Sequence, residues 1–523
     1  MNAPRKLILV VASLLVLSPL MFSSATNVYI TQNGSSQGSC STNPQSAAWF
    51  NSASNWGGGA SQIGPGTTVL LCGTITTPLT FQGSGTSASP ITLTFDTGAA
   101  ISATCGGSGC LSAANRSYVI VDGGTPCGWI SQAQVACNGT IQNTTSEPSG
   151  SQFGIDGTNC SNCEFRNLNI GPLYTKSSGG TEPSGDIRGV QAVSSAGSGT
   201  WLVHNNILHD TSSAIVYVPN GSNDNGFQAY NNVTYNINSS VDISNNNNGT
   251  LTAALVHDNN FGSTANWDNS GCPDHHNSLH AFAYTTTNSG IKYYNNLING
   301  NWGGCATGGL YFEGTNSTIF VYNNVWLMTY TQMNNGIVGM DGSGFTSTVQ
   351  FYNNTILGQS QPGDVCMTLG SGSSPVSISI ENNVISGCET LFAGEGSAIT
   401  WTKADYNTWG GSSGSTPWGL HCDPGPCSYY NFSGWQAAVS GESHSTFGSS
   451  TSYVGVNSNG MLESSSPAIG AGTNLTGLGI AALDFDIAGV PRPGGSAAWD
   501  DSAHTLGSGS APAPPTGLSA QVQ

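Results

Sequence analysis

A short phrase recurs through the middle of this chain at nearly constant spacing. It consists of an aromatic, charged or histidine residue, two asparagines, and then an apolar residue or threonine, as in YNNV, YNNL, YNNT and ENNV. The second asparagine, or the single one in the last copy, falls at Asn206, Asn232, Asn260, Asn296, Asn324, Asn354, Asn383 and Asn407. The successive gaps are 26, 28, 36, 28, 30, 29 and 24 residues. Repeats of this length are typical of a solenoid, in which each unit buries its apolar face by stacking on its neighbours.

Each repeat also carries two short runs with the chemistry of β-strands. One repeat reads "GGLYFEG" and then "STIFVYNNVWL", and the next reads "GIVGMDG" and then "STVQFYNNTIL". Apolar residues alternate in these runs, and clusters of Gly, Ser, Asn and Thr separate them. The pattern predicts an all-β protein that folds as a parallel β-helix. Equivalent asparagines would then lie about 4.8 Å apart and form a hydrogen-bonded ladder of side-chain amides.

Two further phrases resemble segments of known proteins. "GTSASPITLTF" at Gly85–Phe95 looks like the opening of the first coils in alginate-lyase-like and chondroitinase-like β-helices. "SPAIGAGTNL" and "DFDIAGVPRPGG", within Ser466–Gly495, are similar to a phrase found after many secreted bacterial β-helices. From about residue 60 to about residue 410, the chain resembles the right-handed parallel β-helix proteins of the pectate-lyase-like superfamily. The resemblance implies an architecture and no particular reaction.

The sequence departs from the enzyme families that share this architecture. It lacks the closely spaced aspartates and the Gly-His-Gly phrase of polygalacturonases, and the Arg-x-Pro-x-x-Arg pattern of pectate lyases. The Lys and Arg pair of alginate-type lyases has no matching context, so Lys176, Arg188 and Lys292 remain isolated candidates. No family's catalytic residues can therefore be transferred to this chain.

The domain organisation follows from the extent of the repeats. Residues 1–25 are predicted to be a secretory signal peptide, because Arg5 and Lys6 precede an apolar run from Leu7 to Leu17. An uncleaved membrane anchor is the alternative. We expect an N-terminal cap at 26–60, the β-helix at 61–452, a loop-rich C-terminal segment at 453–500 that covers the other end, and a disordered, linker-like tail at 501–523.

The cysteines point to an oxidising compartment. All 14 follow the predicted signal peptide, and an even number fits disulfide bonds. The pairs closest in sequence are Cys105 with Cys110, Cys127 with Cys137, Cys160 with Cys163, Cys366 with Cys388, and Cys422 with Cys427. The CSNC phrase at Cys160–Cys163 could instead bind zinc, but no second CxxC or suitably spaced histidine completes four ligands.

The charge balance limits the partners of the protein. The chain has 9 Lys and Arg against 27 Asp and Glu, and its net charge of −18 becomes −20 when Arg5 and Lys6 leave with the signal peptide. Such a surface argues against nucleic acid and anionic membranes. It also disfavours polyanionic glycans unless cations bridge the charges, so Ca²⁺ held by acids of adjacent coils is the cofactor that we consider. We expect a monomer whose partner is an extracellular polysaccharide.

The widest gap in the repeat, between Asn260 and Asn296, marks an inserted loop, and loops of solenoids carry function. The candidates for substrate binding in and around this loop are Trp267, Asp274, His275, His276, Tyr284, Trp302 and Tyr311. Their aromatic members could offer surfaces on which sugar rings stack. A disulfide between Cys272 and Cys305 would bridge adjacent coils and hold the loop in place.

Strand alternation predicts a row of acids and a histidine beside this loop. If Leu279 and Ala281 point inward in "SLHAFAY", then His280 points outward. The same reasoning applied to the neighbouring repeats predicts four outward catalytic candidates on consecutive coils, namely Asp242, His280, Glu313 and Asp341. Neighbours in such a row lie about 5 Å apart at the backbone, and alternate members about 10 Å apart.

Carboxylates at these separations suit the cleavage of a glycan. In hydrolysis, one carboxyl group gives a proton and the other acts as base or nucleophile. His280 could orient a carboxylate or act as the base of an elimination. The sequence therefore favours a secreted enzyme that cleaves a polysaccharide, as a hydrolase or a lyase. Outward acids are often ordinary solvated surface, so a non-catalytic carbohydrate-binding or structural protein of the cell surface or matrix is the alternative.

Overall fold

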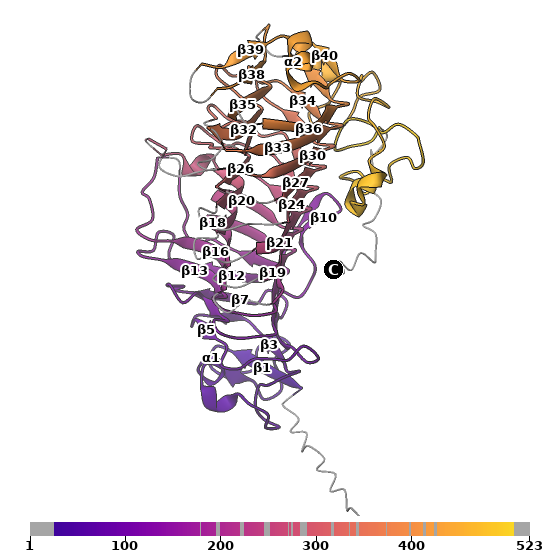
Figure 1. The fold of residues 1–523 in the computed structure, drawn as a ribbon. Helices are drawn as coiled ribbons and strands as arrows, with labels where there is room; N and C mark the ends of the chain where they lie inside the picture. Colours follow the sequence, from indigo (N-terminus) through magenta and orange to yellow (C-terminus); the bar gives the residue numbers. More distant parts are fainter. Residues whose placement is uncertain are drawn as a thin grey trace, which may run out of the picture.

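The computed structural model describes residues 26–506, apart from gaps at 178, 195–198, 220–223, 245–250, 270, 273–275, 283–289, 315–317, 334, 341–344, 373, 397–398, 412–414 and 423–425. Figure 1 shows one elongated solenoid, with α1 (Ala47–Phe50) at its N-terminal end and α2 (Phe432–Val439) at the other. Strands of successive coils pair in parallel and in register. The protein is therefore an all-β parallel β-helix, as the repeat predicts.

The strands form three columns along the solenoid. The first column consists of β2 (Gln45–Ser46), β1 (Asn27–Thr31), β3 (Thr68–Leu71), β6 (Ile91–Phe95), β9 (Val119–Asp122), β14 (Cys163–Arg166), β17 (Trp201–His204), β19 (Asp224–Tyr230), β21 (Leu251–His257), β24 (Ile291–Tyr294), β27 (Thr318–Tyr322), β30 (Thr348–Tyr352), β33 (Val376–Glu381) and β36 (Ile399–Asp405). The second column consists of β4 (Thr74–Ile75), β7 (Ala100–Ala103), β12 (Gly139–Asn143), β15 (Leu168–Ile170), β22 (Asn260–Phe261), β25 (Leu297–Ile298), β28 (Val325–Trp326), β31 (Thr355–Leu357), β34 (Val384–Ser386), β37 (Thr408–Gly410) and β40 (Thr446–Gly448).

The third column completes each coil. It consists of β5 (Leu79–Thr80), β8 (Leu111–Ser112), β13 (Gln152–Asp156), β16 (Ile187–Ser194), β23 (Asn277–Phe282), β26 (Leu310–Glu313), β29 (Val338–Met340), β32 (Met367–Gly372), β35 (Phe392–Gly396) and β38 (Trp418–Leu420). Two long strands, β18 (Ile207–Pro219) and β20 (Val233–Ser244), run through both the second and the third column. The antiparallel strands are the β10 (Gly128–Ile130) and β11 (Ala133–Val135) hairpin, and β39 (Ser428–Tyr430) beside β38.

A ladder of asparagine side chains runs along the corner between the first and second columns. Asn324 illustrates the pattern, because its Nδ2 donates to Oδ1 of Asn354 at 3.0 Å and to the backbone carbonyl of Tyr293 at 2.9 Å. Its Oδ1 accepts from the backbone N–H and from Nδ2 of Asn296, each at 3.0 Å. The same side-chain bonds connect the buried members Asn206, Asn232, Asn259, Asn296, Asn324, Asn354, Asn383 and Asn407.

The ladder confirms the predicted stacking and corrects one of its members. In the phrase HDNNF the ladder residue is Asn259, whereas Asn260 is the next residue and lies opposite Val233. The residue before each ladder member has a positive φ, at Asn205, Asn231, Asp258, Asn295, Asn323, Asn353, Asn382 and Tyr406. Asn and Asp adopt this left-handed conformation more readily than most other residues with a side chain. This preference explains the first asparagine of the repeated phrase.

A buried glutamate closes the ladder at its last member. Asn407 donates Nδ2 to the two carboxyl oxygens of Glu442 at 3.2 and 3.4 Å, and the hydroxyl of Ser445 donates to the same group. Burial raises the pKa of Glu442 to about 7, against the opposing effect of these donors.

We expect the Glu442→Gln variant to be more stable than the wild-type protein near pH 8 and equally stable near pH 4. The folded protein holds the Glu442 proton up to a pKa of about 7, whereas the unfolded chain releases it near 4.5. The stability that this proton contributes is fully present below the pKa of the unfolded chain. About 3 kcal/mol of it is lost as the pH rises through the pKa of the folded protein. Urea unfolding of both proteins at the two pH values measures the difference in their free energies of unfolding. A difference that does not change with pH would contradict this prediction.

Buried aromatic residues close the N-terminal end. Next to α1 and η1 (Ala53–Asn55), the ring of Phe50 lies 5.0 Å from that of Trp56 and 5.5 Å from that of Phe81. These contacts give residues 26–60 a packed structure at this end, while the predicted signal peptide, 1–25, lies outside the described residues. None of the helices in the described part of the chain is long and apolar enough to cross a membrane.

The C-terminal segment lies along the side of the solenoid and not over its end, which corrects the expectation. In Figure 1, α2 and β39 occupy that end, while the yellow segment runs back beside β30 and β27. The segment includes η3 (Thr451–Val454), η4 (Thr476–Leu478) and η5 (Ala481–Asp484). Asn323 and Asn353 donate Nδ2 to its carbonyl groups, and its Trp499 packs with Tyr322 and Tyr352. The corner between the first and second columns, the asparagine corner, thus presents amide donors and tyrosine rings, and the C-terminal segment packs over both.

Part of the expected tail belongs to this packed segment. Asp501, Ser502 and Ala503 are buried, and Oδ2 of Asp501 accepts a hydrogen bond of 2.9 Å from the hydroxyl of Thr408. Residues 501–506 are therefore ordered structure, contrary to the prediction. The remainder of the predicted tail, 507–523, lies outside the described residues.

All 14 cysteines form disulfide bonds. The five pairs that are close in sequence and the Cys272–Cys305 pair are confirmed, and the Cys160–Cys163 bond uses the two thiols of the CSNC phrase. The remaining bond, Cys40–Cys72, joins two coils at the N-terminal end. Seven disulfides indicate an extracellular, oxidising environment.

Candidate functional site

The predicted catalytic row falls on the outward face of the third column. β20, β23 and β26 lie side by side there, and their register pairs Asp242 with His280 and His280 with Tyr311. Leu279 and Ala281 are fully buried, whereas His280 is partly exposed, which confirms the predicted alternation. Asp242, His280 and Tyr311 therefore point outward from three consecutive coils.

Glu313 lies two residues further along its strand than the prediction requires. Its register partner is Phe282, and Tyr311 takes the place beside His280. The Glu313 side chain nevertheless leans back, so that its Oε1 lies 3.9 Å from Nε2 of His280. The two side chains are 15 and 14 % exposed. Both side chains are therefore partly exposed at the surface, although Nε2 of His280 itself is buried.

Aromatic rings and a serine complete the surroundings of these groups. The ring of His280 lies 4.6 Å from that of Phe282 and 5.5 Å from that of Tyr311. On the preceding coil, the hydroxyl of Ser239 donates to Oδ1 of Asp242 at 2.5 Å and orients this carboxylate. The outward face thus combines two carboxylates, an imidazole and aromatic surface.

The structure tests only part of the predicted substrate-binding set. Asp274, His275 and Tyr284 lie outside the described residues, as does the catalytic candidate Asp341. Trp267, Trp302 and His276 are fully buried, so they cannot present a ring face to a sugar. Trp267 lies in η2 (Ala265–Trp267), and its indole N–H donates to the carbonyl of Asn236 at 3.0 Å. The expectation that these three residues contact substrate is wrong, because their side chains pack inside the protein.

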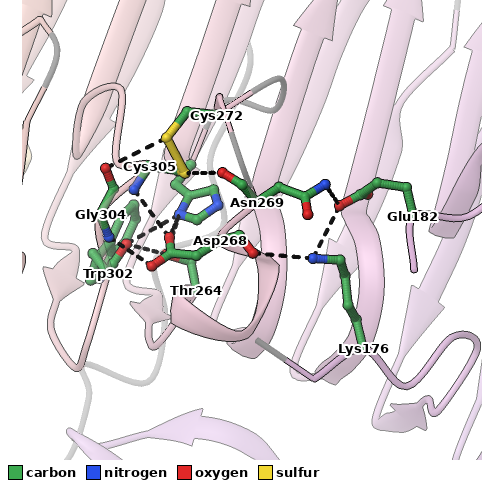
Figure 2. Close-up of a disulfide and its surroundings, with 10 residues drawn as sticks. Lys176, Glu182, Thr264, Asp268, Asn269, Cys272, Trp302, Gly304 and Cys305 are labelled. Atoms are coloured by element: carbon green, nitrogen blue, oxygen red, sulfur yellow. Dashed lines mark hydrogen bonds and ion pairs between the residues drawn. A yellow bond between two sulfur atoms is a disulfide. The ribbon is translucent and has the colours of Figure 1, made fainter. Parts of the chain in front are cut away.

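A hydrogen-bonded network holds this loop against the next coil (Figure 2). The carboxylate of Asp268 accepts from the backbone N–H groups of Gly304 at 2.8 Å and Cys305 at 3.1 Å. Nδ1 of His276 lies 3.1 Å from the carbonyl of Trp302 and 3.1 Å from the hydroxyl of Thr264. Burial lowers the pKa of His276, so its imidazole is neutral at neutral pH. His276 is therefore a structural residue of the loop.

A buried lysine connects the same loop to a second one, 171–186, as Figure 2 also shows. Nζ of Lys176 lies 3.0 Å from a carboxylate oxygen of Glu182 and 5.6 Å above the ring of Trp267, and its side chain is fully buried. Asn269 donates its amide to the same glutamate. The two long loops thus meet above the short corners of β18 and β20.

We expect the Cys272→Ser, Cys305→Ser double variant to lose about 4 kcal/mol of stability, because the bond closes a loop of 33 residues. The matched control is Cys422→Ser, Cys427→Ser, whose bond spans a separation of 5 residues and should contribute about 2 kcal/mol. Chemical denaturation of both variants gives the two values. Equal losses would show that the Cys272–Cys305 bond does not constrain the chain in this way.

Sequence reasoning missed the structural partners of the site. Ser239 lies three residues before Asp242 on the same strand, and the register brings Phe282 beside Glu313. The Lys176–Glu182 pair joins loops that are about 90 residues apart in sequence, counted from Lys176 to Asn266. The sequence offered one indication of the Lys176 contact, namely the scarcity of lysine and arginine. In a chain with only nine such residues, each one is a candidate for a specific structural role.

Neither a metal site nor a known relative indicates the function of this site. Across the part of the chain that the structure describes, no group of three His, Cys, Asp or Glu side chains is placed to hold a metal ion. The sequence matches no known family model and no curated protein. The geometry of the outward face therefore carries the functional argument.

Proposed function

We propose that the protein is a secreted glycoside hydrolase that cleaves an uncharged polysaccharide on the outward face of β20, β23 and β26. One observation carries this proposal, namely that His280 lies between two carboxylates. Asp242 is its partner on the preceding coil, and Glu313 lies 3.9 Å away on the following coil. Glycoside hydrolysis requires a proton donor and a base on two sides of the scissile bond, and two carboxyl groups supply both. The seven disulfides and the predicted signal peptide support secretion.

The spacing of the carboxylates favours inversion of the anomeric carbon. Asp242 and Glu313 lie on strands two coils apart and are offset by two residues in register, so their backbones are separated by roughly 12 Å. Glu313 leans toward His280 and thus toward Asp242, which shortens the distance between the carboxyl groups. Inverting enzymes need roughly 6.5 to 9.5 Å, which leaves room for a water, whereas retaining enzymes need about 5 Å.

The contacts of each group support a role for it in this proposal. Glu313 is the general acid, and the imidazole of His280 beside it positions its carboxyl group and exchanges protons with it. Asp242 is the general base that activates water, in an orientation set by the hydroxyl of Ser239. Phe282, which is partly exposed, gives an apolar surface to the sugar ring, whereas Tyr311 is buried and supports the ring of His280 from below.

The cations near this face favour an uncharged substrate over a uronate. Lys176 is buried in its pair with Glu182. The guanidinium of Arg188, three coils before His280, bonds to Asp186 at 2.9 Å and to Gln191 at 2.6 Å. Neither group is available to balance the carboxylate of a uronate, which elimination would require. Hydrolysis therefore fits the site better than elimination.

A substrate screen tests this proposal. Purified protein is incubated with neutral polysaccharides (mixed-linkage β-glucan, xylan and glucomannan) and with the anionic polygalacturonate and alginate. We expect new reducing ends from a neutral polymer, without the ultraviolet absorbance of unsaturated products. Unsaturated products would identify a lyase instead. Binding to a polymer without any cleavage across the panel would identify a non-catalytic carbohydrate-binding protein.

A further inference from the structure

Among the stacked rings on the outside of the described part of the solenoid, two rows end differently. The longer row lies on the asparagine corner, where neighbouring rings are parallel and 4.4 to 5.1 Å apart along His204, Tyr230, His257, Tyr294 and Tyr322. Each ring in this row covers the next one, and Tyr322 continues into the contact with the C-terminal segment. This row is therefore occupied by packing within the protein.

The shorter row lies on the outward face of the second column and stops after two rings. His209 and Tyr235 stack at 4.9 Å with 5° between their planes, and Oδ2 of Asp210 holds Nδ1 of His209 at 2.6 Å. On the next coil the equivalent position is Gly262, one residue after the paired Thr234 and Phe261. Tyr235 is 37 % exposed, and among the described residues no ring covers its second face.

The missing side chain leaves a notch between Tyr235 and Asn299, with Gly262 at its base. A Cβ atom on Gly262 would lie 3.6 Å from Cβ of Tyr235 and 3.8 Å from Oδ1 of Asn299. Successive coils are about 4.8 Å apart, so one omitted side chain leaves the thickness of one ring. The glycine is also required by the backbone, because the same Cβ would lie 2.9 Å from the carbonyl oxygen of Thr234. The backbone therefore requires a glycine at this position, and the notch beside Tyr235 follows from it.

We propose that the Tyr235 notch binds a sugar ring of an uncharged polysaccharide, which stacks on Tyr235 as the next layer of the row. The apolar face of a pyranose matches the exposed face of the tyrosine. The amide of Asn299 offers hydrogen bonds to hydroxyl groups at the rim. The carboxylate of Asp210, on the coil before Tyr235, is engaged by His209 and Asn236. The negative charge of Asp210 disfavours an acidic sugar. The notch lies on a different column from His280, so it would hold a polymer without cleaving it and does not rest on the proposed hydrolysis.

Affinity electrophoresis tests this inference in native gels that contain mixed-linkage β-glucan, xylan or glucomannan, with polygalacturonate as the anionic comparison. All proteins carry Glu313→Gln, so that cleavage of the gel polymer does not affect migration. We expect the parent to be retarded in a neutral gel. Tyr235→Ala should weaken binding about 5- to 10-fold, and Tyr235→Phe should bind within about twofold of the parent because it keeps the ring. Asn299→Leu should also weaken binding, because the larger apolar side chain fills the notch.

Tyr429→Ala is the matched control, because Tyr429 is 56 % exposed at the far end of the solenoid. It should migrate as the parent does. Equal retardation of the parent, Tyr235→Ala and Asn299→Leu would overturn the inference, and so would a parent that no neutral polymer retards. Circular dichroism of each variant separates lost binding from lost folding. Turnover by the protein with Glu313 intact is measured separately, so failure of the notch and failure of the hydrolase are distinguishable.

Discussion

Glu313→Gln should lower the turnover number for the polysaccharide by 10²- to 10⁴-fold, on the order of what a general acid contributes, with KM changed by less than about threefold. The amide has the shape of the carboxyl group but cannot deliver a proton to the leaving oxygen. It keeps the position beside Phe282 and the approach to His280. Reducing-end release at several substrate concentrations gives both constants.

Matched variants separate this effect from a general loss of structure. Glu389→Gln is the control. Glu389 is an exposed glutamate of the same solenoid, and in the described contacts it accepts a hydrogen bond from the backbone N–H of Gly363. This variant should leave turnover unchanged. Asp242→Asn should cause a loss similar to that of Glu313→Gln, because the base is then absent. His280→Ala should cause a smaller loss and shift the alkaline limb of the pH–rate profile, which reports the general acid beside it. Full activity of either carboxylate variant would remove the residue from the proposed mechanism.

Asn324→Leu should destabilise the protein by about 3 to 6 kcal/mol. The substitution leaves the backbone N–H and Nδ2 of Asn296 without their acceptor, and it leaves the carbonyl of Tyr293 without one donor. Each buried polar group without a partner costs on the order of 1 to 3 kcal/mol. The free energy of unfolding, from chemical denaturation of both proteins, measures the loss.

Asn33→Leu is the comparison for this variant. Asn33 is exposed near the N-terminal end and lies outside the ladder, so the change in stability should stay within about 0.5 kcal/mol. A loss for Asn324→Leu no larger than that for Asn33→Leu would mean that the amide ladder does not stabilise the coils.

The spacing of the asparagines was enough to predict the solenoid, because stacking imposes the same requirement at the same point of every coil. The detailed assignment failed where the local pattern is degenerate. HDNNF offers two asparagines in sequence, and only the observed bonds select Asn259 over Asn260. Strand alternation likewise predicts which face a residue occupies but not its register, since a shift by two residues keeps the same face. Glu313 was therefore placed on the correct face and beside the wrong partner.

The inserted loop and the C-terminal segment show what sequence could not predict. Trp267 and Trp302 are apolar residues in loops, and nothing local decides whether such a ring turns toward solvent or toward the core. Contacts with other segments set the direction of these side chains. The carbonyl of Asn236 holds the indole of Trp267, and the carbonyl of Trp302 lies next to the imidazole of His276. The path of the C-terminal segment depends in the same way on Asn323 and Asn353, which lie about 150 residues before their partners.

The stereochemistry of the first product tests the central functional claim most directly. Proton NMR of the anomeric region, recorded while the wild-type protein cleaves a neutral oligosaccharide, shows which anomer forms before mutarotation. Two carboxylates on coils either side of His280 predict an initial product with inverted configuration. A retained configuration, an unsaturated end, or an oligosaccharide that stays intact would contradict the proposed reaction at this site.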